Sequence, residues 1–226
     1  MPSIVTLIQK LYVKVRGLTA REGIPRGFYQ PRVRRRAAHA LAGRTGRLLD
    51  VGCGRGFFLE EVAITAPQLG LVGIDYAVNQ LTFTRAYVDQ HASSAPLLVC
   101  ARAEALPFPA ETFEAASCLN LFYNLPSMAV VRTLLLEMAR ILKPGGRCLV
   151  DIRNRWNFPT VLRFRLRRWH DPSFPYSLNA YTASELEAAL EGTGLRPVRR
   201  HRIGLLKSPL CPVIVFELEK KTGEPA

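Results

Sequence analysis

The chain has 226 residues, of which 48% are hydrophobic and 22% are charged, and its net charge at pH 7 is +13. This length and composition are typical of one globular domain and exclude a disordered or fibrous chain. No apolar run approaches the ~20 residues of a membrane-spanning helix, and the N-terminus lacks the apolar block of a secretory signal, so the sequence predicts a soluble, cytoplasmic protein.

The positive charge lies on segments that flank the centre of the chain. Residues 1–47 carry eleven Lys or Arg against one acid, whereas residues 48–152 carry seven against ten. Residues 153–168 add six arginines and residues 196–207 add five basic residues, in both cases without an acid. We therefore expect any anionic partner to meet these flanks.

Cysteine and histidine are placed without the spacing of a metal site. The five cysteines form no C-x-x-C pair and mostly lie in apolar runs, and the four histidines are scattered. The sequence therefore predicts buried thiols in a reducing compartment, no disulfide framework and no metal centre.

Residues 1–45 are predicted to form a helical appendage to the main domain. Apolar residues recur at helical spacing over residues 3–16, and a second, basic helix is expected over Val33–Leu41. The first helix is expected to cover the site as a lid, and the alternative is that it anchors the chain to a membrane surface.

From residue 46 onward, short apolar runs alternate with helical patterns. Runs of this length bounded by Gly, Pro and Asp are typical of strands buried on both faces, and the alternation predicts a parallel sheet with helices on both sides. The predicted strands are Leu48–Val51, Leu69–Ile74, Leu97–Cys100, Ala115–Leu119 and Arg147–Ile152, and the predicted helices are Phe57–Ala66, Ala77–His91 and Met128–Leu142, the last of which stops at Lys143-Pro144-Gly145-Gly146.

The chain after the fifth strand is different in character. An Arg-rich and aromatic-rich insertion over residues 153–181 is expected to roof a pocket. A helix over Thr182–Leu190 follows, and the runs Arg196–Ile203 and Pro212–Leu218 are predicted to pair antiparallel at the sheet edge because their connection is short.

A glycine-rich turn, Asp50-Val51-Gly52-Cys53-Gly54-Arg55-Gly56, joins the first predicted strand to its helix. The glycines permit a tight turn and let a ligand approach the backbone, and the helix offers free N–H groups. Nineteen positions after Gly56, Asp75 ends the second predicted strand. Its carboxylate can there accept both hydroxyls of a ribose.

These motifs and two later ones resemble the class I S-adenosylmethionine-dependent methyltransferases, in particular the small single-domain enzymes with a ubiquinone/menaquinone-methyltransferase type of core. The resemblance covers residues 46–152, and the glycines follow G-x-G-x-G behind an acid instead of the G-x-G-x-x-G of nicotinamide dehydrogenases. The motifs that carry it are Asp50–Gly56, Gly73-Ile74-Asp75, Ala103–Phe108 with Phe113-Glu114, and Ala139–Gly146.

The resemblance implies an α/β fold: a Rossmann-like mixed sheet of seven strands in the order 3-2-1-4-5-7-6, with strand 7 antiparallel and helices on both faces. It divides the chain into an N-terminal helical lid, residues 1–45, and a methyltransferase domain, residues 46–226. The insertion over residues 153–181 belongs to that domain.

The resemblance also implies S-adenosylmethionine as cofactor and assigns residues to it. The chain has Ala101-Arg102-Ala103 where many relatives have Gly-Asp-Ala, and Arg102 cannot accept a hydrogen bond. The adenine contact is therefore expected either from the backbone and Glu104 or from Arg102 stacked on the base. The implied cofactor residues are Asp50 for the amino group, Gly52, Cys53, Gly54 and Gly56 for the methionine end, Asp75 for the ribose, Tyr76, Ala103 and Glu104 for the adenine, and Asn120 and Leu121 beside the sulfur.

The implied reaction is in-line displacement at the sulfonium methyl, in which positioning and desolvation supply most of the rate. No residue is compelling as a catalytic base. His170, beside Asp171 in the insertion, and Tyr123 are the candidates, and His201 is expected to face solvent.

The aromatic residues and arginines after residue 153 suit an acceptor with an apolar or cyclic body and an anionic handle, such as a lipid-linked or sugar-linked metabolite. An RNA methyltransferase that uses the basic flanks is the second interpretation. A noncatalytic S-adenosylmethionine-binding or membrane-surface protein is the third. The sequence leaves open the acceptor, the methylated atom and the oligomeric state.

Overall fold

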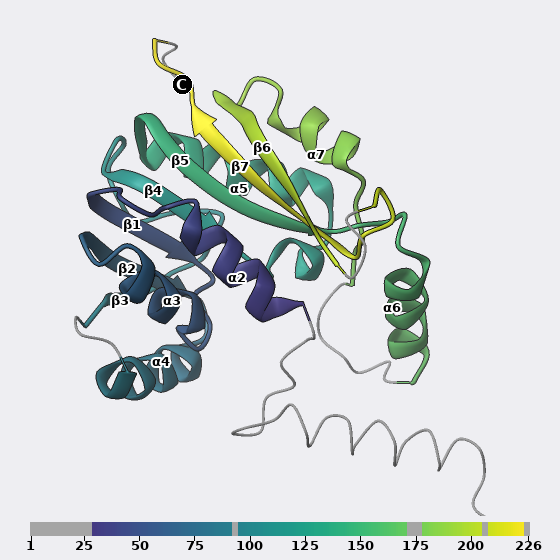
Figure 1. Ribbon diagram of the computed structural model, residues 1–226, viewed down its shortest axis with the longest axis horizontal. Coiled ribbons are helices and arrows are strands. Elements are labelled where there is room, and N and C mark those ends of the chain that lie inside the picture. The colour runs from purple at the N-terminus through teal and green to yellow at the C-terminus, as the bar shows by residue number, and fades with distance from the viewer. Residues whose placement is uncertain (1–28, 92–94, 171–177, 205–207, 224–226) are drawn as a thin grey trace, which may run out of the picture.

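The computed structural model describes residues 29–91, 95–170, 178–204 and 208–223 (Figure 1). Its centre is a seven-stranded sheet with the order β3-β2-β1-β4-β5-β7-β6. The strands are β1 (Gly46–Val51), β2 (Leu69–Asp75), β3 (Leu97–Cys100), β4 (Phe113–Cys118), β5 (Leu142–Arg153), β6 (Leu195–Ile203) and β7 (Val213–Lys220). The helices are α2 (Gln30–His39), α3 (Phe57–Thr65), α4 (Val78–His91), α5 (Met128–Ile141), α6 (Phe158–His170) and α7 (Ala183–Leu190), with a short 3-10 turn η1 (Phe122–Asn124).

Strands β3, β2, β1, β4 and β5 are parallel, and β7 is antiparallel to both β5 and β6. The predicted strand order, the antiparallel seventh strand and the edge pair are therefore confirmed. Because parallel strands share one direction, β1, β2, β4 and β5 end at the same edge of the sheet, where ligands bind in open α/β folds.

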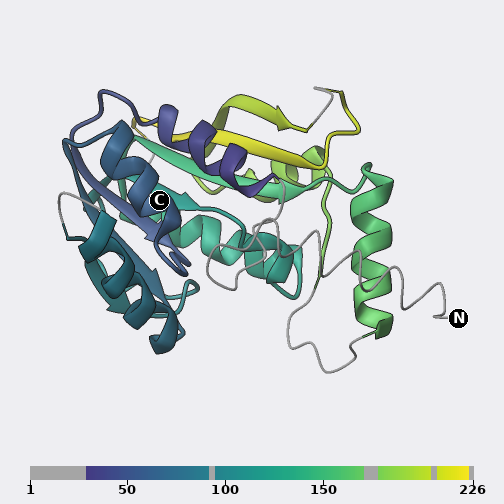
Figure 2. The same ribbon diagram turned by 60° about the horizontal axis from the view of Figure 1, so that its bottom comes forward.

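The sheet is buried on both faces. Leu48 and Leu49 are neighbours in β1, yet they belong to two different core clusters, because successive strand side chains point to opposite faces. One cluster includes residues of α2, α3 and α4, and the other includes residues of α5 and α7 (Figures 1 and 2). This double burial explains why the central strands lack an apolar/polar alternation in the sequence.

The start of β5 differs from the prediction. Helix α5 ends at Ile141, but the strand begins at Leu142 and includes the Pro-Gly segment that was predicted to separate them. Leu142 pairs with Phe113 of β4, and the pairing register shifts between Phe113 and Ala115. Strands tolerate Pro and Gly at such irregular positions, because the regular ladder of hydrogen bonds is interrupted there.

The N-terminal flank is described only from residue 29. Helix α2 carries a proline in its first turn, begins three residues before the predicted Val33, and buries Val33, Ala37 and Ala38 completely against the main domain. The helix predicted over residues 3–16 lies outside the described residues. Within the described part of the chain, no helix is long and apolar enough to cross a membrane.

Candidate active site

The glycine turn after β1 leaves room for a ligand on one side and for a helix on the other. Gly54 and Gly56 have φ of 52° and 76°, in the left-handed region that favours glycine. A Cβ on Gly56 would lie 2.6 Å from Cγ2 of Thr84, whereas a Cβ on Gly54 would meet nothing nearer than the Gly52 carbonyl oxygen at 4.0 Å. Gly56 therefore permits close packing on α4, and Gly54 leaves open space over the backbone.

Thr84 of helix α4 contacts the glycine turn on the side that faces the helix, and this residue was not among those predicted for the site. The buried Thr84 hydroxyl lies 2.5 Å from the carbonyl oxygen of Gly54 and 2.9 Å from that of Gln80. The second contact is the usual bond of a helical Thr to the residue four positions earlier. Nothing in the local sequence indicates the first contact, which joins residues thirty positions apart.

Asp75 stands at the end of β2 and binds the glycine turn directly. Its Oδ2 accepts a hydrogen bond from the Gly54 N–H at 3.0 Å, and its Oδ1 accepts one from the Ala77 N–H at 3.0 Å. A carboxylate offers about four lone-pair positions, so about two remain for hydroxyl donors. The half-buried carboxylate thus has the capacity that the ribose prediction requires.

Asp50, the acid in front of the glycines, is buried at 3% exposure. The Ser117 hydroxyl of β4 donates to its Oδ1 at 2.7 Å. The pKa of Asp50 is raised to about 7, chiefly by burial; the Ser117 hydrogen bond lowers it, and the negative charge of Asp75 adds to the rise. A cation that reaches this carboxylate would stabilise its charged form, which suits the predicted contact with the cofactor's amino group.

Cys53 has a structural role in the glycine turn. Its N–H donates to the Ile74 carbonyl at 2.8 Å, which fastens the turn to β2. Its side chain is buried, and burial raises the pKa of the thiol well above its usual range. Gly73 makes room for it, since a Cβ there would lie 3.0 Å from Sγ.

The residues predicted for the adenine lie on the β3 side of Asp75. The Ala101 N–H donates to the Asp75 carbonyl at 3.1 Å, and Tyr76 is 59% exposed. Arg102 forms an ion pair with Glu104 at 3.7 Å, and Ala103 packs against a core cluster. The adenine contact itself remains a prediction.

Asn120 and Leu121 follow β4, at the same edge as the glycine turn. A Cβ on Gly52 would lie 3.1 Å from Leu121 Cδ2, so the two segments adjoin. Asn120 has a φ of 59°, which is uncommon for a non-glycine residue. This backbone shape is held by a buried ion pair of β5, Asp151 and Arg153, that the sequence analysis did not assign to the site.

The ion pair binds both ends of Asn120. The Asn120 N–H donates to Asp151 Oδ1 at 2.5 Å, and the side-chain oxygen of Asn120 accepts from Arg153 Nη2 at 2.6 Å. Arg153 Nη1 donates to Asp151 Oδ2 at 2.5 Å. With its charge paired to Asp151, the Arg153 guanidinium serves as a positioning group at the end of β5.

Aromatic side chains continue the site toward α6. The guanidinium of Arg153 lies 4.6 Å from the ring centroid of Tyr123, and the Tyr123 ring stacks on Phe164 of α6 with centroids 6.0 Å apart. Tyr123, a candidate base, is therefore enclosed between two partners. His170, the other candidate, is the last residue of α6, and its side chain lies outside the described part of the chain.

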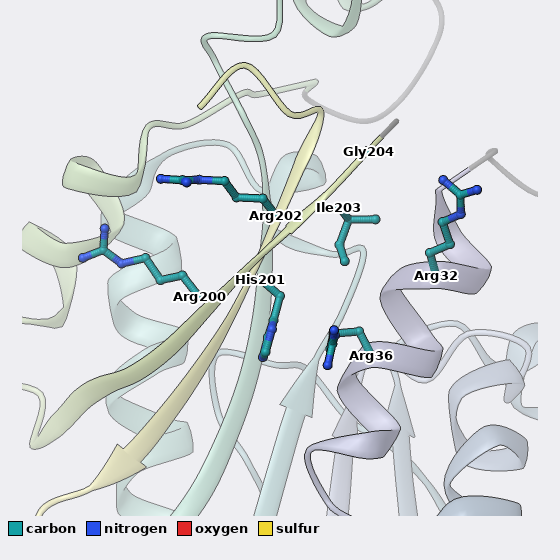
Figure 3. Close-up of a pocket in the computed structure, with 7 residues that line it drawn as sticks. All are labelled: Arg32, Arg36, Arg200, His201, Arg202, Ile203 and Gly204. Carbon is teal, nitrogen blue, oxygen red and sulfur yellow. The ribbon is translucent and has the colours of Figure 1, made fainter. Parts of the chain in front are cut away.

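A cavity of about 570 Å³ lies between α2 and the end of β6, away from the glycine turn (Figure 3). No residue predicted to bind the cofactor lines it. The cavity is basic, and its lining consists of Arg32, Arg36, Arg200, His201, Arg202, Ile203 and Gly204.

His201 was predicted to face solvent, but its side chain is only 10% exposed and contacts Glu217 of β7.

The described residues contain no group of three or more His, Cys, Asp or Glu side chains that could hold a metal ion. The groups at the candidate active site are instead backbone amides, carboxylates and open space over glycine. These are suited to an amino acid and a ribose, which are the parts of S-adenosylmethionine that the predicted residues would bind.

Known proteins share this sequence pattern and fold. A family model described as "Methyltransferase domain" matches residues 49–150. A demethylmenaquinone methyltransferase from Bacillus licheniformis is 32% identical over 171 residues, which cover 68% of this chain and 72% of that protein. Another, from Deinococcus radiodurans, is 36% identical over 131 residues, which cover 57% of this chain and 50% of that protein.

Among solved structures, the N-methyltransferase NodS from Bradyrhizobium japonicum in complex with S-adenosyl-L-homocysteine superposes with a TM-score of 0.65. The match covers 92% of this chain and 98% of that one at 18% identity, so it bears on the fold alone.

The chain spans half or less of the length of several curated relatives: the match covers 28%, 50% and 45% of three of them. The Bacillus licheniformis relative, in contrast, is matched over most of its length. Together with the family model, the strand order and the glycine turn bound to Asp75, this match shows that the chain belongs to the class I S-adenosylmethionine-dependent methyltransferases.

Proposed function

We propose that the protein transfers the methyl group of S-adenosylmethionine to a small, largely apolar acceptor. The observation that carries the proposal is the bond between Asp75 and the Gly54 N–H at the carboxyl edge of the sheet. It brings the carboxylate and the open backbone of the turn together, and Leu121 adjoins the same turn through Gly52. A ligand with a ribose at one end and an amino acid at the other, as in S-adenosylmethionine, would fit these three contacts.

The cofactor supplies a methyl group on a positively charged sulfur, which is itself the leaving group. The task of the chain is therefore to bind, to orient and to exclude water. Asp50 would accept from the amino group, Asp75 from the ribose hydroxyls, and the open face at Gly54 would receive the methionine end. Asn120, fixed by Asp151 and Arg153, would border the side from which an acceptor approaches.

Two observations favour an apolar acceptor over an anionic one. The wall beyond Asn120 is aromatic, because Tyr123 stacks on Phe164 there. The guanidinium at that wall, Arg153, is already paired with Asp151 and offers no net charge. The relatives named for demethylmenaquinone act on a molecule with a ring and an apolar body, in keeping with such a wall.

The experiment is a transfer assay with methyl-labelled S-adenosylmethionine offered, in separate reactions, to lipid extract, water-soluble metabolites and bulk RNA. Label in the lipid extract is the expected result, and the Asp75→Ala variant should produce much less of it at the same cofactor concentration. Label in RNA or only in water-soluble anions would contradict the acceptor class. Absence of label from all three, with S-adenosylhomocysteine still bound, would contradict the activity.

A further inference from the structure

Helix α6 has a buried face that holds it to the active site. Thr160 and Phe164, one turn apart, are 5% and 9% exposed. Phe164 stacks on Tyr123, next to the Asp151–Arg153 pair. The orientation of the helix is thus fixed from the inside.

The opposite face of α6 is apolar and exposed. Phe158, Leu162 and Leu166 are 69%, 41% and 44% exposed. Their spacing of four residues places them on one stripe, and at 100° per residue the centre of that stripe lies roughly 180° from the line through Thr160 and Phe164. Trp156, just before the helix, is 66% exposed. We name these four residues the outer stripe.

Arginines border the outer stripe. Arg165 and Arg163 are both exposed and project on its two sides, at roughly 100° and 260° from Phe164 on the same helical scale. Among the described residues, no acidic side chain pairs with either guanidinium, and α6 itself contains no acid. A narrow apolar stripe between cations is the pattern of a helix that lies in a lipid–water interface.

More positive charge lies at the same edge of the sheet. Ile203 pairs with Val213, and Val213 pairs with Arg153, so β6 ends where β5 ends and α6 begins. The basic cavity between α2 and β6 opens there, with Arg32, Arg36 and Arg202 in its lining (Figure 3). Helix α4 lies at the other end of the molecule (Figures 1 and 2).

We propose that the outer stripe docks on an anionic lipid bilayer, with α6 lying flat in the interface. At 13 residues the helix is about 20 Å long, too short to span a bilayer and suited to lie along it. A second copy of the chain fits the stripe poorly, since two such helices would bring unpaired arginines together. The docked surface is a new assignment, whereas entry of a lipid-like acceptor from the bilayer past Phe164 rests on the proposed function.

The chain carries its own probe for this inference. Its two tryptophans, Trp156 and Trp169, both lie in the segment from residue 156 to residue 170. Tryptophan fluorescence should therefore shift to shorter wavelength when full-length protein is mixed with vesicles of phosphatidylcholine containing about one-third phosphatidylglycerol, and shift much less with pure phosphatidylcholine. Co-sedimentation with the same vesicles gives the affinity.

The Leu162→Ser/Leu166→Ser variant should bind the anionic vesicles at least about tenfold more weakly. Its matched control is Ile64→Ser, which alters a 73% exposed apolar residue on α3. The Arg163→Gln/Arg165→Gln variant should lose affinity for anionic vesicles and become less sensitive to salt, while Arg85→Gln on α4 should not. Each variant should bind S-adenosylhomocysteine as the unaltered protein does.

Three outcomes would overturn the inference. The first is no binding of the unaltered protein to anionic vesicles, or equal loss in Ile64→Ser. The second is a dimer by light scattering that the Leu162→Ser/Leu166→Ser variant dissociates, which would make the outer stripe a self-association surface. The third is a thermal destabilisation by that variant well beyond Ile64→Ser, which would show that the outer stripe packs against the chain itself. Vesicle binding needs no cofactor, so failure of methyl transfer would leave this test intact.

Discussion

The Gly54 N–H donates to Asp75 Oδ2 across twenty-one positions of sequence, at 3.0 Å. This bond makes the carboxylate part of the glycine turn as well as a ribose acceptor. Asp75→Ala should therefore weaken S-adenosylhomocysteine binding by about 1.5 to 3 kcal/mol per lost bond, roughly ten- to hundredfold. Glu61→Ala, which removes a carboxylate of α3, is the control and should bind normally.

Any side chain at Gly56 should destabilise the fold, because Thr84 packs directly against this position. Gly56→Ala adds a left-handed alanine, a cost of about 1 to 2 kcal/mol, and a contact of 2.6 Å with Thr84 Cγ2. Gly194→Ala isolates the backbone cost, because Gly194 has the same φ of 76° and open space around it. Urea unfolding should show a larger loss for Gly56→Ala than for Gly194→Ala. In the Gly56→Ala background Thr84→Ser, which removes only the methyl group, should restore part of the difference.

Asp50 should make stability fall as pH rises. Its pKa is raised to about 7 in the folded protein from 3.8, so between these values the unfolded chain has lost a proton that the folded chain keeps. The loss of folding stability from ionising buried Asp50 is absent below pH ~4 and complete above pH ~7. At ~1.4 kcal/mol per pKa unit, this loss has an upper limit of ~4 kcal/mol.

Asp50→Asn should therefore be more stable than the unaltered protein at pH 8 and equal to it near pH 4. Because Asp50 ionises between pH 6 and pH 8, the affinity of the unaltered protein for S-adenosylhomocysteine should rise over this range. The Asp50→Asn variant should bind more weakly at pH 8 and should lack this rise. Thermal unfolding and calorimetry across this range check both. Equal stability of the two proteins at pH 8 would contradict the burial argument.

Asn120 should be more sensitive to alanine than to glycine. Both substitutions remove the acceptor of Arg153, but only alanine retains the cost of a φ of 59°, about 1 kcal/mol. The unfolding free energy of Asn120→Gly should thus exceed that of Asn120→Ala by about that amount. Equal values would mean that the Asp151 contact does not hold this backbone conformation.

The sequence predicted the candidate site best at the residues that directly follow the parallel strands. The resemblance placed Asp50, the glycines and Asp75, which follow the first two strands, in one cofactor site, and the structure brings Gly54 and Asp75 into contact. Thr84, Ser117 and the Asp151–Arg153 pair were missed. Their contacts join distant segments, and none of these residue types is unusual where it stands.

The insertion after β5 was predicted by composition only. Its arginines suited either an acceptor with an anionic handle or a solvated helix face; Arg163 and Arg165 are exposed on the outer side of α6, and Arg153 is paired with Asp151. The inner face is distinguished from the outer one by the burial of Thr160 and by the packing of Phe164 on Tyr123.

The most direct test of the account is calorimetric titration of the full chain with S-adenosylhomocysteine, without added metal. We predict saturable binding at one site, a loss of about tenfold or more in Asp75→Ala, and no change in Glu61→Ala. Absence of binding, undiminished affinity in Asp75→Ala, or tighter binding of a nicotinamide dinucleotide would contradict the assignment of this site.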